Sequence, residues 1–300
     1  MPNQVLYLLL FLSVLGGGLF VFAPLLAESL LFQPSRGDPG SPPELGGVAG
    51  ELITVEASDG VAIQAWWYQL PGSAAAEVEG GLLSVSTSAP AVLFLHGNAG
   101  DISHRTALAM GLLSSGLSVL LLEYRGYGGS GGSPSEEGLH LDAVAGHEYL
   151  SRRLGSPERV VVFGRSMGGA VAARLAAERT VGALIVEASF TSLEAMARSL
   201  YPFLPGFLFN RLRGRFDTLS RLSEVTAPIL IVHGSEDEIV PLEMGKALAE
   251  AAGPAGEWLE VDGAGHNDVF WVGGREYFGR LAGFVRERVG GEPRKKDSPH

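Results

Sequence analysis

The chain contains no cysteine among its 300 residues. This absence excludes disulfide bonds, a cysteine nucleophile and thiolate metal sites. Basic residues are also few, because 22 Lys and Arg stand against 33 Asp and Glu and give a formal net charge of -11. A nucleic-acid-binding protein normally carries a basic surface, so we exclude DNA and RNA as partners. The length fits one large domain, alone or with an appended segment.

Charged side chains are missing from residues 2–27, and residues 5–22 are mostly Leu, Val and Phe. About 20 apolar residues suffice to cross a bilayer, so we predict a single-pass membrane anchor within residues 1–32. The alternative is a cleaved signal peptide, which would make the protein secreted or periplasmic. No Lys or Arg precedes the apolar run, and residues 25–27 (LLA) form a poor cleavage site, so the anchor is favoured.

Composition divides the remaining chain into three parts. Residues 33–50 are rich in Pro and Gly and predict a linker between anchor and domain. We place the folded domain at residues 51–290 and a charged tail at residues 291–300. The domain opens with two segments around a Ser-Asp-Gly turn, residues 51–56 and 62–68, that predict a β-hairpin.

Residues 70–90 are rich in Ala, Gly and Ser and predict a long exposed loop. From residue 91 onward, short apolar strands alternate with helical stretches. The predicted strands span residues 91–95, 118–123, 160–163, 183–187, 229–232 and 258–261. The predicted helices span residues 104–114, 136–153, 170–178, 241–252 and 276–289. This alternation indicates an α/β fold with a mostly parallel sheet covered on both faces, and its ligand site is expected beyond the carboxyl ends of the strands.

Residues 164–168 (GRSMG) place Ser166 between a predicted strand and a predicted helix. Such a sharp strand-to-helix reversal strains the serine backbone and exposes its hydroxyl, which suits a nucleophile. The glycines two residues before and after leave room for the crossing backbones. The alternative is a glycine-rich turn with a surface serine, because the five-residue pattern is common by itself.

A serine hydroxyl becomes nucleophilic when a base takes its proton and an acid orients that base. The predicted base is His266, which lies in a loop after the last predicted strand. His96 and His233 also follow strands, and we expect His96 to be structural. The helical and terminal histidines are interpreted as surface or packing residues; they are His104, His140, His147 and His300.

The predicted acid is Asp237, in a loop after the strand at residues 229–232. A carboxylate in this loop can reach a histidine in the next strand-end loop. Spacing does not separate Asp237 from Glu236 and Glu238, and a solvated acidic turn is the alternative interpretation. Along the chain the nucleophile comes first, the acid second and the histidine last, which is the order found in one known class of serine hydrolases.

Residues 96–100 (HGNAG) follow the first parallel strand, and their small side chains let backbone N–H groups point into the site. We predict an oxyanion hole formed by the backbone N–H groups of Asn98 and Met167. A tight turn in which His96 is hydrogen-bonded for structure is the alternative, and both interpretations can hold together.

Five motifs occur in a fixed order, and together they resemble one family over about residues 50–288. They are HGNAG at 96–100, EYRGYGGS at 123–130, PSEEG at 134–138, GRSMGG at 164–169 and GHND at 265–268. The chain resembles α/β-hydrolases of the Bem46 / ABHD13 / ABHD17 type. The resemblance implies an α/β-hydrolase fold and a serine hydrolase with the triad Ser166, Asp237 and His266.

The resemblance also implies relatives that are often membrane-anchored at the N-terminus, some of which remove acyl groups from protein thioesters. Two features depart from the family pattern. Glu123 stands where the family usually has Asp, and a cysteine-free apolar segment replaces the palmitoylated, cysteine-rich N-terminus of the relatives.

Residues 189–225 leave the strand-helix alternation and predict a small cap above the active-site edge. Within them, residues 201–209 (YPFLPGFLF) are apolar despite two prolines and a glycine. Our hypothesis is that this segment either forms an apolar acyl pocket, with Phe203 and Phe207 binding substrate, or contacts the bilayer. Packing over the sheet edge is the alternative.

The sequence thus predicts a membrane-anchored serine hydrolase that cleaves carboxylic esters or thioesters through an acyl-enzyme, without metal or organic cofactor. A small-molecule or lipid-like acyl ester is the expected substrate. A peptidase or amidase with the same triad is one alternative. A non-catalytic binding protein on a hydrolase fold is another, although it would be expected to have lost a triad residue. Haloalkane dehalogenase chemistry is disfavoured because it needs a carboxylate where Ser166 stands.

Overall fold

The computed structural model describes residues 31–35, 37–71, 75–79, 82–86, 89–203, 209 and 215–289. The predicted anchor up to residue 30, the predicted tail and Phe207 lie outside the described residues. Within the described part of the chain, no helix combines the length and apolar character needed to cross a bilayer.

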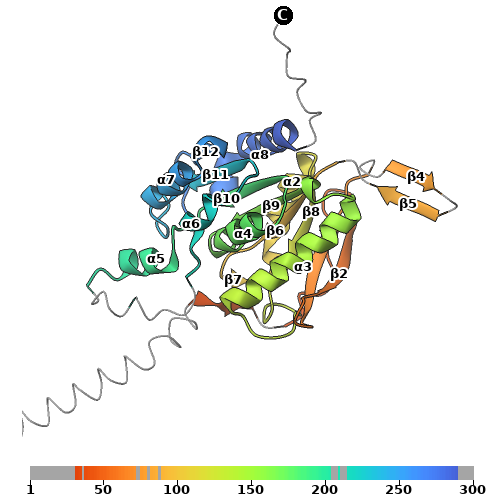
Figure 1. Ribbon diagram of the computed structural model, residues 1–300, viewed down its shortest axis with the longest axis horizontal. Coiled ribbons are helices and arrows are strands. Elements are labelled where there is room, and N and C mark those ends of the chain that lie inside the picture. The colour runs from red at the N-terminus through yellow and green to blue at the C-terminus, as the bar shows by residue number, and fades with distance from the viewer. Residues whose placement is uncertain are drawn as a thin grey trace, which may run out of the picture.

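An eight-stranded sheet forms the centre of the molecule, in the order β12-β11-β10-β9-β6-β8-β3-β2 (Figure 1). β2 pairs antiparallel with β3, and β3 with β8; the other neighbours pair parallel. The strands are β2 (Gly50–Glu56), β3 (Ala62–Tyr68), β6 (Ala91–Leu95), β8 (Ser118–Leu122), β9 (Val160–Arg165), β10 (Ala183–Glu187), β11 (Ile229–Gly234) and β12 (Gly256–Val261).

Successive residues of the central strands enter two separate apolar cores. On β6, Leu93 and Leu95 belong to one core, while Val92 and Phe94 belong to the other. Because both faces of the sheet are covered, every residue of β6, β8, β9 and β10 is buried, which explains their mostly apolar sequences.

Two groups of helices cover the two faces. The first core receives side chains of α3 (Glu136–Leu154), α4 (Met167–Glu178), α6 (Thr218–Leu222) and α7 (Leu242–Ala251). The second receives side chains of α2 (Thr106–Ser114) and α8 (Val269–Arg288). The cap contributes α5 (Leu193–Leu200), and short 3-10 turns lie at Ile102–Arg105 (η1), Pro157–Arg159 (η2) and Gly253–Ala255 (η4).

The longest helix on the first face, α3, has clear start and stop signals. The Ser135 hydroxyl accepts a hydrogen bond from Gly138 N at 3.0 Å, and Glu136 and Glu137 occupy the first turn near the positive end of the helix dipole. The helix ends at Gly155, whose φ of 72° favours glycine. The prediction of a helix from residue 136 is confirmed.

Backbone pairing outside the parallel sheet occurs in two regions whose sequences did not predict it. In residues 33–50, predicted as a linker between anchor and domain, β1 (Gln33–Pro34) pairs with β7 (Ala99–Gly100), and the side chains of Leu45 and Val48 are buried. The segment after residue 70 is not only a loop, because β4 (Ala75–Glu79) and β5 (Leu82–Ser86) form a separate antiparallel pair beside the main body (Figure 1). β1 is only two residues long, so no apolar alternation signals it in the sequence.

Candidate active site

Ser166 lies at the turn between β9 and α4, in a backbone conformation that few residues adopt. Its φ is 54° and its ψ is -123°, and its N–H donates to Glu187 O at 2.8 Å. The glycines around it are required by close packing. A Cβ added to Gly164 would lie 2.2 Å from Gly168 O, and one added to Gly168 would lie 2.1 Å from Leu95 O. The tight turn therefore holds Ser166 in a strained conformation.

Of the three residues predicted to form a catalytic triad, His266 lies within hydrogen-bond distance of both Ser166 and Asp237. His266 Nε2 is 3.2 Å from Ser166 Oγ, and His266 Nδ1 is 2.8 Å from Asp237 Oδ2. Oδ1 of Asp237 accepts hydrogen bonds from Ile239 N at 2.9 Å and Val240 N at 2.7 Å. This arrangement allows proton transfer from the serine hydroxyl to the imidazole; the catalytic roles themselves stay predictions.

Geometry also separates Asp237 from its two acidic neighbours. The side chain of Asp237 is fully buried, whereas Glu236 is exposed and Glu238 accepts a hydrogen bond from the backbone N of His266 at 3.1 Å. Burial opposes ionisation of Asp237, but its hydrogen bond to His266, the nearby imidazole charge and two backbone N–H groups hold its pKa below the usual value. Asp237 therefore stays ionised at neutral pH.

A second histidine contacts the same carboxylate, and the sequence did not predict this contact. His233 is completely buried, and its Nε2 lies 2.9 Å from Val240 O and 3.3 Å from Asp237 Oδ2. A carbonyl oxygen can only accept, so Nε2 carries the proton. The ring stacks near Trp258, with 6.5 Å between ring centroids. Within the described residues, its Nδ1 has no hydrogen-bond partner.

A buried ionic network holds the loop that carries His266. Arg165 Nη2 donates to His266 O at 2.5 Å and to Asn267 Oδ1 at 3.2 Å. Arg165 Nε lies 3.1 Å from Glu187 Oε1, and the Tyr277 hydroxyl donates to the other oxygen of Glu187. Burial raises the pKa of Glu187, while Arg165 and Tyr277 oppose that shift. The residue before the candidate nucleophile thus connects β10 and α8 to the His266 loop.

The loop predicted to form the oxyanion hole is held by hydrogen bonds to its carbonyl groups. Asn98 O accepts from Gln33 N at 2.9 Å and from the Tyr127 hydroxyl at 2.8 Å. Met167 is the first residue of α4, directly after Ser166. The two peptide N–H groups belong to the segments that flank the serine, and their role as oxyanion donors stays a prediction.

His96 has the structural environment that we expected. It is fully buried, its Nδ1 lies 2.7 Å from Gly97 O, and its Nε2 lies 2.9 Å from Glu123 Oε1. The second oxygen of Glu123 accepts from Ile102 N at 3.0 Å. Glu123, which departs from the family pattern, therefore connects β8 to η1 and to the candidate oxyanion loop.

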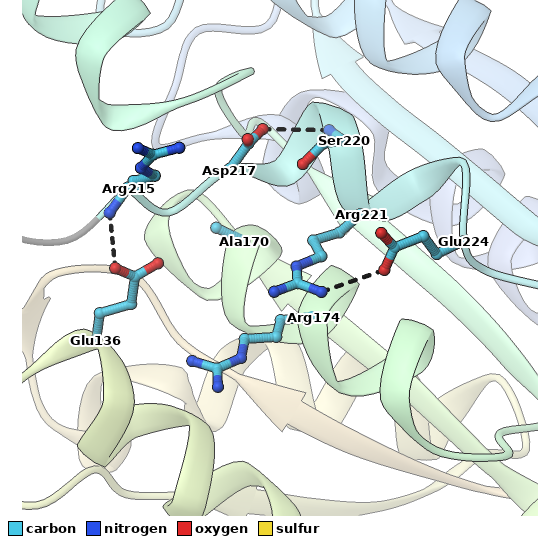
Figure 2. Close-up of a pocket in the computed structure, with 8 residues that line it drawn as sticks. All are labelled: Glu136, Ala170, Arg174, Arg215, Asp217, Ser220, Arg221 and Glu224. Atoms are coloured by element: carbon cyan, nitrogen blue, oxygen red, sulfur yellow. Dashed lines mark hydrogen bonds and ion pairs between the residues drawn. The ribbon is translucent and has the colours of Figure 1, made fainter.

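A polar pocket of about 480 Å³ lies between α3, α4 and residues 215–224, which include α6 (Figure 2). It is lined by Glu136, Ala170, Arg174, Arg215, Asp217, Ser220, Arg221 and Glu224. Several of its charged groups have partners within the protein: Arg221 Nη1 lies 3.1 Å from Glu224 Oε2, Arg174 pairs with Glu137 and Glu178 outside the lining, and Glu136 accepts from the backbone N of Arg215 at 2.6 Å. We interpret this pocket as the joint between the cap and the body.

Phe203, one of the two residues predicted to bind substrate, is 77% exposed and contacts Tyr201 with an edge-to-face ring geometry. Phe207 lies outside the described residues, so the acyl pocket stays a prediction. No group of three or more His, Cys, Asp or Glu in the described part of the chain is placed to hold a metal ion.

Comparison with known proteins places this site in a family. A model of the alpha/beta hydrolase fold matches residues 90–210. An uncharacterized protein of Mycobacterium tuberculosis (strain ATCC 25618 / H37Rv) is 37% identical over 278 residues, which cover 92% of either chain. The alpha/beta hydrolase domain-containing protein WAV2 of Arabidopsis thaliana is 34% identical, covering 90% of this chain and 91% of that protein.

Human alpha/beta hydrolase domain-containing protein 17B is 35% identical over 200 residues, covering 66% of this chain and 67% of that protein. Among solved structures, a Pyrococcus furiosus esterase, Pf2001, superposes with a TM-score of 0.67 at 21% identity, covering 87% of this chain and 98% of that chain. A puromycin-hydrolyzing peptidase of Mycobacterium tuberculosis superposes with a TM-score of 0.60 at 20% identity, covering 84% of this chain and 41% of that chain. These structural likenesses establish the fold, and the relatives establish the family: the chain is an ABHD17-like member of the α/β-hydrolases.

Proposed function

We propose that this protein is a serine hydrolase that cleaves carboxylic esters or thioesters through an acyl-enzyme intermediate. One observation carries the proposal. His266 bridges Ser166 Oγ at 3.2 Å and Asp237 Oδ2 at 2.8 Å in a chain of the α/β-hydrolase family. Three residues from three separate loops meet in the order that serine activation requires.

In the proposed first half-reaction, Ser166 Oγ attacks the acyl carbonyl carbon while His266 Nε2 takes the hydroxyl proton. The N–H groups of Asn98 and Met167 stabilise the negative charge that develops on the carbonyl oxygen. His266 then gives its proton to the departing alkoxide or thiolate as the bond to the acyl carbon breaks. Asp237 keeps His266 in the tautomer that carries its proton on Nδ1, and it stabilises the imidazolium that forms when Nε2 takes up a proton.

The second half-reaction releases the acyl group. A water molecule gives a proton to His266 Nε2 and attacks the acyl carbon, and Ser166 leaves with that proton. The carboxylic acid is the product. No step needs a redox partner or a covalent group other than Ser166.

The alternatives use the same fold. A peptidase or amidase would need a protonated nitrogen leaving group, and both an esterase and a peptidase are among the solved structures with this fold. A non-catalytic binding protein remains the alternative from another class, and the complete Ser166, His266 and Asp237 contact set argues against it.

The proposal extends to location and substrate. The uncharged apolar run at residues 5–22 supports a membrane anchor and hence a lipid-like acyl ester as substrate. Carbonate extraction of the expressed full chain, with mass determination of its N-terminus, tests this point. Retention in the membrane with an intact N-terminus supports the anchor, whereas a truncated, released protein supports the signal peptide.

Turnover assays on the detergent-solubilised full chain test the chemistry. The substrates are p-nitrophenyl esters of increasing chain length, an acyl thioester and a p-nitroanilide, each assayed beside Ser166→Ala. We expect ester and thioester turnover that is lost in Ser166→Ala, with much slower anilide cleavage. Anilide turnover equal to ester turnover would favour the amidase. A folded wild-type protein without turnover would favour the binding protein.

A further inference from the structure

The backbone carbonyl groups of the loop that carries Asn98 are all held by hydrogen bonds. This loop, residues 96–100, runs past the candidate nucleophile, since a Cβ added to Gly97 would lie 3.4 Å from Ser166 Cβ. Each of its carbonyl oxygens accepts from a donor of the surrounding structure or of the loop itself. The bonds run from the Tyr124 hydroxyl to His96 O at 3.1 Å, from His96 Nδ1 to Gly97 O at 2.7 Å, from Gln33 N at 2.9 Å and the Tyr127 hydroxyl at 2.8 Å to Asn98 O, from Arg105 Nη2 to Ala99 O, and from Ser35 N to Gly100 O at 3.1 Å.

The N–H of Asn98 has no such partner. Among the described residues it donates to no group. A planar trans peptide directs its C=O and its N–H to opposite sides, and Gly97 O and Asn98 N belong to one peptide. Because His96 Nδ1 holds that oxygen, it also fixes the direction of the Asn98 N–H. An unused and oriented donor beside Ser166 suits the stabilisation of an oxyanion.

Two of the donors that hold this loop come from the segment by which the chain enters the domain. We call residues 31–35, which include β1, the entry segment. Gln33 N donates to Asn98 O and Ser35 N to Gly100 O, while Ser35 O accepts from Gly128 N at 3.1 Å. The entry segment therefore lies between the 96–100 loop and the loop after β8 that carries Gly128.

Apolar contacts hold the start of the entry segment against the body. The ring of Phe32 contacts the ring of Phe216, with 6.2 Å between centroids, and both Leu31 and Phe32 pack against the first core. Phe216 is buried, and its N–H donates to Glu136 Oε1 at 2.7 Å. The entry segment is thus held at Phe32 and at β1, so a displacement of its first residues reaches the 96–100 loop.

We propose that the entry segment is a positioning element of the oxyanion hole. The two peptides that flank the Asn98 Cα are both held, one by His96 and the other by Gln33 and Tyr127. This keeps the Asn98 N–H aimed at the position where negative charge develops, which an oxyanion donor requires. The inference rests on the hydrolase function proposed above, and it places functional residues before residue 51, where the sequence predicts only a linker.

Removing the donors to Asn98 O tests the proposal on the solubilised full chain. Gln33→Pro deletes the backbone N–H, whereas Gln33→Ala retains it and is the conservative variant. Tyr127→Phe removes the second donor and keeps the ring. The matched control is Tyr68→Phe, because Tyr68 is also fully buried but its hydroxyl has no hydrogen-bond partner in the described part of the chain.

We expect ester kcat to fall by about threefold to tenfold in Gln33→Pro and in Tyr127→Phe, because each loses one hydrogen bond of ordinary strength. The double variant should lose about tenfold to a hundredfold, approaching the loss of a whole oxyanion donor, with KM nearly unchanged. A trifluoromethyl ketone forms a serine adduct that carries an oxyanion, so its Ki should rise by the factor by which kcat/KM falls. Gln33→Ala should restore both values, and Tyr68→Phe should change neither.

The outcomes separate this inference from the proposed function. An active wild type whose double variant keeps its kcat overturns the inference and leaves the hydrolase intact. A fall in kcat with unchanged inhibitor Ki, or an equal fall in Gln33→Ala, also overturns it. Wild type with neither ester turnover nor inhibitor binding refutes the hydrolase itself. If urea unfolding shows that Gln33→Pro is not folded, Phe32→Ala, which loosens the entry segment without touching the loop, must shift kcat and Ki together.

Discussion

The buried imidazole of His233 lies 3.3 Å from Asp237 Oδ2, the same oxygen that contacts His266 at 2.8 Å. The Asp237 carboxylate accepts three hydrogen bonds, from His266 on Oδ2 and from two backbone N–H groups on Oδ1, and His233 Nε2, which is hydrogen-bonded to Val240 O at 2.9 Å, is a further polar neighbour of Oδ2. A carboxylate held by several donors has a fixed orientation and remains ionised. We infer that His233 is a positioning residue for the candidate acid.

Replacing His233 tests this inference. His233→Phe keeps a ring but removes the hydrogen bond to Val240 O, the residue whose backbone N–H holds Asp237 Oδ1, and the polar neighbour of Asp237 Oδ2. We expect ester kcat to fall by about tenfold to a hundredfold with little change in KM. His233→Gln retains an N–H at the position of Nε2 and should recover part of the rate. Equal kcat for wild type and His233→Phe would contradict the positioning role.

Asp237→Asn tests the acid that the structure selects. An amide in this position stabilises the wrong imidazole tautomer, so we expect ester kcat to fall by up to about 10⁴-fold. The matched control is Glu236→Gln, since Glu236 is an exposed neighbour in the same loop, and its activity should match wild type. A larger loss of ester kcat in Glu236→Gln than in Asp237→Asn would assign the role of the triad acid to Glu236 instead.

The contact between Arg165 and Glu187 predicts a coupled loss of stability. Arg165→Met leaves the Glu187 carboxylate buried without its cation, which costs about 3–5 kcal/mol. Adding Glu187→Gln removes the unpaired charge, so the double variant should be more stable than Arg165→Met. Urea unfolding measures each variant, with Arg152→Met as control because the Arg152 side chain is 72% exposed. Additive effects of the two substitutions would contradict the coupling.

His147 predicts a pH dependence of stability. Burial lowers the pKa of His147 below the usual 6.5, although its hydrogen bond to Thr180 O opposes the shift. As pH falls below about 6.5 the unfolded chain takes up the proton before the folded chain does, so the free energy of unfolding decreases. The free energy of unfolding continues to decrease until the pH reaches the lower pKa that His147 has in the folded protein.

Urea unfolding of wild type and His147→Gln between pH 7.5 and 5 measures this effect. Because the other groups titrate equally in both proteins, the stability of wild type relative to the variant should fall as the pH falls below about 6.5. A difference that does not change with pH would contradict the assignment. His147 lies on α3, outside the candidate site, so ester kcat should not change.

The parallel sheet was predictable because its strands are short apolar runs separated by helices. β6 and β10 begin and end at the predicted residues, and α4 begins at Met167, three residues earlier than predicted. The sequence pattern that predicts strands was weaker where strands pair without burying a run of apolar side chains. β1 pairs with β7 through backbone hydrogen bonds, and a Pro- and Gly-rich composition does not reveal such a pairing.

The candidate site was predictable only in part. Motif spacing indicated Ser166 and His266, and the order of the loops indicated Asp237. Contacts such as that between Glu187 and Tyr277, which are 90 residues apart, leave no local pattern. His233 lies at the carboxyl end of β11 (Ile229–Gly234), and that position drew attention to it as a base. Its contact with Asp237 became visible only in three dimensions.

The most direct test of the account is covalent labelling of Ser166 by a fluorophosphonate. The solubilised full chain and Ser166→Ala are incubated with the probe and measured by intact mass and peptide mapping, with circular dichroism to confirm that both are folded. The account predicts one adduct per chain on Ser166 of the wild type and none on Ser166→Ala. A folded wild-type protein that remains unlabelled, or equal labelling of both proteins, would contradict the assignment of Ser166 as an activated nucleophile.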